Sequence, residues 1–122
     1  MSALNKQVAG NHYKVQKIQP IELAYMLGQT PAFCKVCKYA TRIKDDPVQQ
    51  LNKALHCIEL DRELSRYHKY YEFSPMEFAN NHINEFTEDT LLRKVLEHMH
   101  IGQYSQAIRY MQQMISREEG KL

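Results

Sequence analysis

The sequence lacks tryptophan, has few glycines and contains no long apolar run. With four glycines it carries neither glycine-rich phosphate loop, G-x-x-x-x-G-K-[ST] or G-x-G-x-x-G, so a phosphate site must use side chains. No run approaches the roughly 20 apolar residues of a membrane-spanning helix, and the first residues lack the apolar segment of a secretory signal. We therefore expect a cytoplasmic protein without a membrane partner.

Cysteine is also scarce, and the three cysteines form no disulfide framework. Cys34-x-x-Cys37 is at most half of a zinc site, because structural zinc needs four ligands. A redox role would place Cys34 near a helix start, which lowers the pKa of a thiol. Our expectation is that Cys34, Cys37 and Cys57 are inert core residues and that the protein binds no structural metal.

Length and charge set the remaining bounds. A chain of 122 residues with 43% hydrophobic and 25% charged residues predicts one globular domain. The formal net charge of +2 is too small to indicate a nucleic-acid partner. Any basic surface must therefore be local.

All four prolines stand where helices are expected to begin, because the first N–H of a helix has no intrahelical partner. The expected starts are Pro20, Pro31 after the cap Thr30, Pro47 after the cap Asp46, and Pro75 in a capping box from Ser74 to Glu77. Gly28 should end the first helix. The third helix is expected to run to about Tyr67.

Apolar spacing of three to four residues continues through the second half, over 76–83, 88–100 and 104–117. The sequence thus predicts an all-α fold of five to six helices, with a helix-turn-helix core and a C-terminal αα-hairpin. Only Val15–Gln19 reads as extended. We expect a flexible lead over residues 1–10, a core over 11–73, and a helical extension over 74–122 that packs on the core or at an oligomer interface.

A basic stripe marks the second helix, where Lys35, Lys38 and Arg42 share one face with Tyr39. Lys53 joins them if the second and third helices pack antiparallel. Three or four cations beside an aromatic ring suit a phosphorylated ligand. The alternative is a solvated basic face.

Other polar groups are candidates for the same ligand. Asn11, His12 and Tyr13 lie in a lead-in where a loop needs neither aromatic nor imidazole groups, although helix capping and packing would also explain them. Glu22 and Asp61 are carboxylates that could hold Mg²⁺ beside a nucleotide, or simply face solvent. The aromatic cluster Tyr67, Tyr70, Tyr71 and Phe73 closes the core, forms an oligomer contact or stacks on bases.

Several of these pieces stand in an order that resembles a known family. They are Asn11-His12-Tyr13, Ile18-Gln19-Pro20-Ile21-Glu22, Lys38-Tyr39-x-x-Arg42, and Leu51-x-Lys53-Ala54 with Arg62-Glu63-Leu64. This pattern is similar to the small phage-encoded SaV-like family, a domain of unknown function that includes a podovirus nucleotide kinase without a Walker motif. The family usually has Gly-Asn where Cys34-Lys35 stand and an acid where Gln50 stands.

The resemblance implies a protein of the infected bacterial cytoplasm that phosphorylates deoxynucleoside monophosphates with ATP and Mg²⁺. The phosphate-binding candidates are then Asn11, His12, Tyr13, Lys35, Lys38, Tyr39, Arg42 and Lys53, with Glu22 or Asp61 near the metal and no catalytic residue assigned. Two alternatives remain open: a non-catalytic binder that sequesters a nucleotide or nucleotide-derived defence signal, and a module that binds a host protein. A homo-oligomer is expected in each case.

Overall fold

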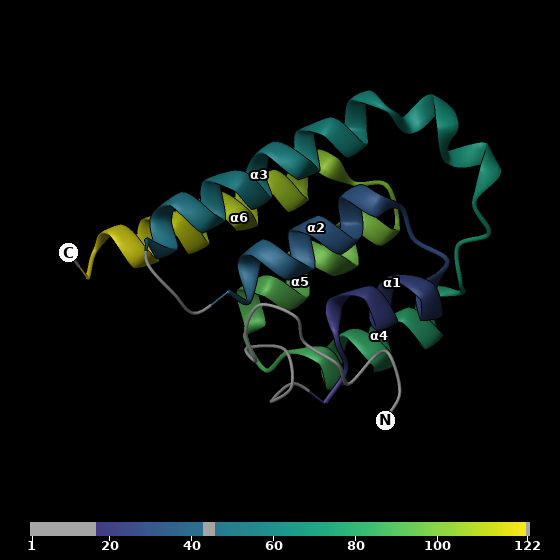
Figure 1. Cartoon of the computed structure of the whole chain (residues 1–122), viewed down its shortest axis with the longest axis horizontal. Helices are drawn as coiled ribbons and strands as arrows, with labels where there is room; N and C mark the ends of the chain where they lie inside the picture. Colours follow the sequence, from purple (N-terminus) through teal and green to yellow (C-terminus); the bar gives the residue numbers. More distant parts are fainter. Residues whose placement is uncertain (1–16, 43–45, 122) are drawn as a thin grey trace, which may run out of the picture.

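The computed structural model describes residues 17–42 and 46–121 (Figure 1). Over those residues the chain forms six α-helices and one 3₁₀ helix and no strand, which confirms the predicted all-α class. The elements are α1 Pro20–Leu27, α2 Pro31–Ala40, α3 Pro47–Glu63, η2 Ser65–Tyr70, α4 Met76–Phe86, α5 Thr90–His100 and α6 Tyr104–Glu119. None of the described helices is long and apolar enough to cross a membrane.

The helices form two layers of three. In Figure 1, α1, α2 and α3 lie side by side in front of α4, α5 and α6, and each front helix packs on its partner: α1 on α4, α2 on α5, α3 on α6. Segment 64–75 connects the layers at one end of the molecule. Residues 76–119 therefore supply the second layer, and one continuous hydrophobic core joins the two.

The core is built from the apolar stripes of all six α-helices. Each stripe repeats every three to four residues, so one face of each helix turns toward the opposite layer. Its largest fully buried side chains are Phe33, Leu23, Leu27, Ile58, Ile83, Leu92, Leu96, Met99 and Met111. Burial of such side chains contributes roughly 1.5–3 kcal/mol each.

Most helix starts follow the proline pattern. Thr30 Oγ1 accepts a hydrogen bond from the Phe33 N–H at 3.2 Å, and Asp46 Oδ1 accepts one from the Gln49 N–H at 3.1 Å. Both predicted caps are thus confirmed. Gly28 ends α1 in the left-handed conformation, as expected.

The capping box expected at Ser74 is wrong. Pro75 occupies the N-cap position of α4, and no side chain there caps the helix. Ser74 instead contacts the end of α1, where its N–H donates to the Leu27 carbonyl at 2.9 Å. Local sequence could not reveal this tie between the two layers.

The third helix ends earlier than Tyr67. It stops at Glu63 and the chain turns into η2, which carries His68 back toward Asp61. Seven residues of continued α-helix would separate these residues by roughly 10 Å along the axis. The hydrogen bond between His68 Nε2 and Asp61 Oδ1, 3.1 Å long, therefore requires the helix to break.

Gly28 is where the connecting segment comes closest to α1. Its φ is +64°, and a Cβ added there would overlap the Glu72 carbonyl oxygen. Gly102 has a similar φ of +77° but has no atom within 4 Å of such a Cβ. A side chain added at Gly102 would therefore introduce backbone strain alone, whereas one added at Gly28 would introduce both strain and steric overlap.

We expect Gly28→Ala to destabilise the protein by about 3 kcal/mol, because left-handed strain adds to a clash with backbone that cannot move away. Gly102→Ala is the control and should cost about 1 kcal/mol, the strain alone. Denaturant unfolding measures both. If both variants lose the same free energy of unfolding, segment 71–74 does not lie against Gly28 in solution.

Candidate functional site

The basic stripe lies along the seam between α2 and α3. Tyr39 sits between two cations, with Arg42 Cζ and Lys53 Nζ each 5.7 Å from its ring centroid. Further along the seam, burial raises the pKa of the Cys57 thiol by more than the positive charge of Lys35 lowers it. Residue numbers rise along α2 as they fall along α3, so the helices are antiparallel and Lys53 joins the stripe.

One pocket opens at the first half of α2, and we name it the tyrosine pocket. It has a volume of about 680 Å³ and a mainly apolar lining. Its walls come from α1, the α1–α2 turn, α2, the end of η2 and the two residues after it: Ile21, Ala24, Tyr25, Gly28, Gln29, Thr30, Pro31, Cys34, Lys35, Lys38, Tyr70, Tyr71 and Glu72. Tyr25 and Tyr70 are 83% and 73% exposed, so their rings are available to a ligand.

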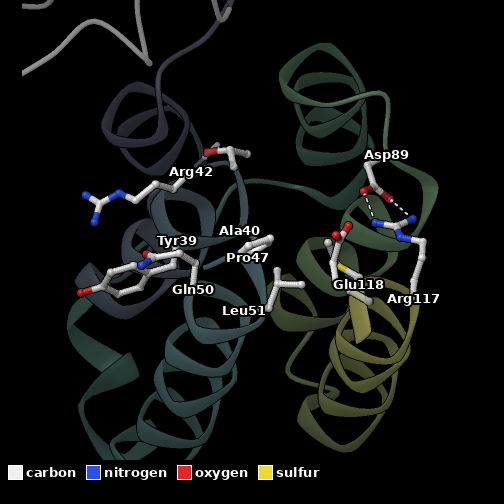
Figure 2. Close-up of a pocket in the computed structure, with 11 residues that line it drawn as sticks. Tyr39, Ala40, Arg42, Pro47, Gln50, Leu51, Asp89, Arg117 and Glu118 are labelled. Atoms are coloured by element: carbon white, nitrogen blue, oxygen red, sulfur yellow. Dashed lines mark hydrogen bonds and ion pairs between the residues drawn. The ribbon is translucent and has the colours of Figure 1, made fainter. Parts of the chain in front are cut away.

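A second pocket, the polar pocket, lies at the other end of α2 and has a volume of about 360 Å³. It is lined by Tyr39, Ala40, Thr41, Arg42, Pro47, Gln50, Leu51, Asp89, Met114, Arg117 and Glu118. Figure 2 shows Tyr39, Arg42 and Gln50 on one side and an ion pair between Asp89 and Arg117 on the other. The predicted stripe is therefore shared between two pockets: Lys35 and Lys38 line the first, Tyr39 and Arg42 the second.

The Asp89–Arg117 pair fixes the far wall of the polar pocket. Arg117 Nη2 donates to Asp89 Oδ2 at 2.6 Å. Burial opposes ionisation of Asp89, but hydrogen bonds from Arg117 and from the N–H groups of Leu91 and Leu92 outweigh it and lower the pKa of this carboxyl. The same carboxylate caps α5, so the wall is tied to the N-terminus of that helix.

Two polar atoms on the near wall have no partner. Within the described part of the chain, neither Gln50 Oε1 nor Arg42 Nε makes a hydrogen bond, although both atoms are buried. Gln50 is only 6% exposed. A buried polar group left unpaired costs about 1–3 kcal/mol, so such groups are uncommon away from functional sites.

Asp61 lies in a different environment from the stripe. It is 2% exposed, and its carboxylate accepts hydrogen bonds from Thr30 Oγ1 at 2.9 Å, Tyr104 Oη at 3.0 Å and His68 Nε2 at 3.1 Å. Burial, together with the negative charge of Asp61, raises the pKa of Tyr104 well above that of a free tyrosine. Three donors from three elements thus surround one carboxylate.

The network continues through His100. Its Nε2 must donate to the Ser74 carbonyl, 2.7 Å away, because a carbonyl only accepts. Nδ1 then accepts from Gln29 Nε2 at 2.9 Å, and Gln29 Oε1 accepts from the Thr30 N–H at 3.1 Å. This chain of bonds joins the α1–α2 turn, the ends of α3 and α5, and the segment before α4.

The two candidate metal carboxylates are therefore engaged elsewhere. Glu22 accepts from the Gln19 N–H at 3.3 Å and closes a capping box at the start of α1. Asp61 belongs to the buried network. Over residues 17–42 and 46–121, no group of three His, Cys, Asp or Glu side chains is arranged to hold a metal ion.

The cysteines lie in or beside the core. Cys37 and Cys57 are buried and Cys34 is half-buried. Burial is the main cause that raises the pKa of all three thiols, and it outweighs the opposing effect of Lys35 and Lys38 on Cys34. The lowered pKa that a redox role for Cys34 requires is thus contradicted.

The remaining sequence candidates, Asn11, His12 and Tyr13, lie outside the described residues. Sequence reasoning also missed Tyr25, Gln50 and the Asp89–Arg117 pair. Gln50 did carry a signal, since it is a polar residue beside Leu51 at the point where the similar family has an acid. Tyr25 and Arg117 carry none, because only the packing of distant segments makes them walls of pockets.

Comparison with known proteins returned no match to a protein-family profile, a curated protein or a solved structure. The family resemblance seen in the sequence motifs stays a prediction.

We expect Asp61→Asn to destabilise the protein by about 3 kcal/mol or more, because an amide offers two donors to a site already filled with donors. Glu59→Gln makes the same chemical change on the exposed side of α3 and should be nearly neutral. Urea unfolding at neutral pH compares the two. Similar stabilities would contradict the buried network.

Proposed function

We propose that this protein binds a nucleotide-class ligand, with the base in the tyrosine pocket and the phosphates on Lys35 and Lys38. The observation that carries the proposal is an apolar pocket of about 680 Å³ whose walls include exposed tyrosines and two lysines of one helix face. Nucleotide chemistry needs both parts, a planar apolar surface for the base and cations for the phosphates.

Tyr25 and Tyr70 suit the base. Stacking of a base on an aromatic side chain is worth about 1–3 kcal/mol and tolerates different bases. The pocket volume lies within the roughly 300–1,000 Å³ typical of small-molecule sites. The tyrosines come from α1 and η2, which Gly28 and the Ser74–Leu27 hydrogen bond hold together.

Lys35, Lys38, Arg42 and Lys53 suit the phosphates. The three lysines are exposed. Lys35, Arg42 and Lys53 lie along the α2–α3 seam and Lys38 lines the tyrosine pocket beside Lys35, so their potentials add. Charge-assisted hydrogen bonds to phosphate oxygens are stronger than neutral ones. A local cationic row therefore supplies what a glycine-rich loop would supply in other nucleotide sites.

The proposal is capture rather than transfer. The Asp61 oxygens already accept three hydrogen bonds, and Glu22 caps α1, so neither carboxylate is placed beside the cationic row. The kinase activity that the family resemblance implies is a further step, which turnover of a deoxynucleoside monophosphate with ATP and Mg²⁺ would establish. The same resemblance suggests the infected bacterial cytoplasm as the setting, and the many aromatic and methionine side chains of a small helical protein suggest a homo-oligomer.

The first experiment is a thermal-shift screen with nucleoside mono-, di- and triphosphates and cyclic nucleotides, each with and without Mg²⁺. A ligand that binds only the folded protein raises its melting temperature. We expect a shift that does not need Mg²⁺. No shift with any nucleotide would contradict the proposal.

Tyr25→Ala should weaken nucleotide binding about tenfold while leaving the melting temperature of the free protein unchanged, because the ring is 83% exposed and contributes little to the core. Isothermal titration calorimetry measures the affinity. The control is Tyr67→Ala, an exposed tyrosine of η2 that does not line the pocket. Equal affinity losses in both variants would count against the tyrosine pocket.

Lys35→Gln combined with Lys38→Gln should weaken phosphate-bearing ligands by about tenfold or more and leave the unphosphorylated nucleoside unaffected. The dependence of affinity on salt should also become shallower. Lys94→Gln combined with Lys121→Gln removes the same charge from exposed positions on α5 and after α6 and serves as the control. If both double variants lose the same affinity for phosphate-bearing ligands, the loss reflects net charge and not the positions of Lys35 and Lys38.

A further inference from the structure

The cationic row has a pocket at each end, and the base and phosphates of the proposed ligand occupy only the tyrosine pocket. We propose that the ligand carries two planar groups joined through phosphates, as a dinucleotide does, and that the second group binds in the polar pocket against Tyr39, Arg42 and Gln50. This inference rests on the proposed function and specifies the class of nucleotide.

The row and the two pockets are continuous along α2. Lys35 and Lys38 line the tyrosine pocket, and Tyr39 and Arg42 line the polar pocket one turn later. Lys35 and Tyr39 are roughly 6 Å apart along the α2 axis, and Arg42 lies two residues beyond the end of the helix. A phosphate bridge lying on this row leaves one nucleoside at each end.

The α3 side of the seam runs in register with α2. Lys35 faces Cys57 and Tyr39 faces Lys53. Arg42 follows just past the end of α2, and Gln50 lies one turn before Lys53 on α3. Both residues line the polar pocket, and Figure 2 shows them on the same side of it as Tyr39. Stacking surface, cation and amide therefore meet at one place.

Gln50 provides the second, independent observation. Its side chain is 94% buried, since 6% is exposed, and its Oε1 has no partner among the described residues. Arg42 Nε is likewise buried and unpaired there. Gln50 Oε1 is an acceptor and Arg42 Nε is a donor, so the near wall holds one polar group of each kind for which the described residues offer no partner.

The ring of Tyr39 completes the subsite. It lies 5.7 Å from the cationic centres of both Arg42 and Lys53. An aromatic ring with cations beside it can stack on a base while the cations reach phosphate oxygens next to that base. The opposite wall carries the Asp89–Arg117 ion pair.

The fold itself gains nothing from an amide at position 50. An unpaired buried acceptor destabilises the free protein, whereas leucine would fill a similar volume without a polar atom. Gln50→Leu should therefore leave the melting temperature unchanged or raise it. A structural role for Gln50 would lower it instead.

The test uses the full chain and calorimetric titration with adenosine and guanosine monophosphates, the corresponding 5′–5′ dinucleoside diphosphates and 3′–5′ cyclic dinucleotides. We expect at least one dinucleotide to bind about tenfold more tightly than its mononucleotide, because the second base binds at a high effective concentration. Gln50→Leu should remove that excess and keep the mononucleotide affinity. Gln49→Leu, at the exposed neighbouring position, should keep both.

Other outcomes overturn the inference in distinguishable ways. Equal affinity for mono- and dinucleotides would reject the second subsite and leave the proposed function standing. A dinucleotide preference that survives Gln50→Leu would place the second base outside the polar pocket. Absence of binding by every nucleotide would reject the proposed function, and the inference with it.

Discussion

The structure depends on one buried carboxylate. Asp61 accepts hydrogen bonds from Thr30 at the start of α2, from His68 in η2 and from Tyr104 at the start of α6. Removal of any donor would leave part of a buried charge unpaired, which is costly in a low-dielectric interior. Satisfying Asp61 therefore fixes three elements at once and forces the chain to reverse after α3.

That reversal builds the candidate site. Because η2 returns to Asp61, its last residue Tyr70 and the following Tyr71 line the tyrosine pocket together with Tyr25, and Glu72 passes beside Gly28. Buried polar atoms without a partner among the described residues occur at both ends of α2: Ser74 Oγ lies in this connecting segment, and Gln50 Oε1 and Arg42 Nε lie near the far end of α2.

The helices could be predicted from the sequence because their signals are local. Proline at first turns, caps at Thr30 and Asp46, and apolar periodicity all lie within a few residues of the helix they define. The errors and omissions concern contacts between distant residues: the Thr30–Asp61, Tyr104–Asp61 and Gln29–His100 bonds join positions 31, 43 and 71 residues apart. No local pattern distinguishes a buried Asp61 from a surface carboxylate, so its true partners could not be found from sequence alone.

Asp61 also explains where an anion can bind. It lies against Thr30, the N-cap of α2, so a negative charge already occupies the end of the helix that would otherwise attract phosphate. The first turn of α2 is thus an unfavourable place for a second anion, because like charges repel strongly where water is excluded. The phosphates of the proposed ligand would instead meet the side-chain cations Lys35 and Lys38 farther along α2 and Arg42 just past its end. The sequence without glycine-rich loops and the structure with a buried carboxylate at the helix start therefore favour the same kind of phosphate site.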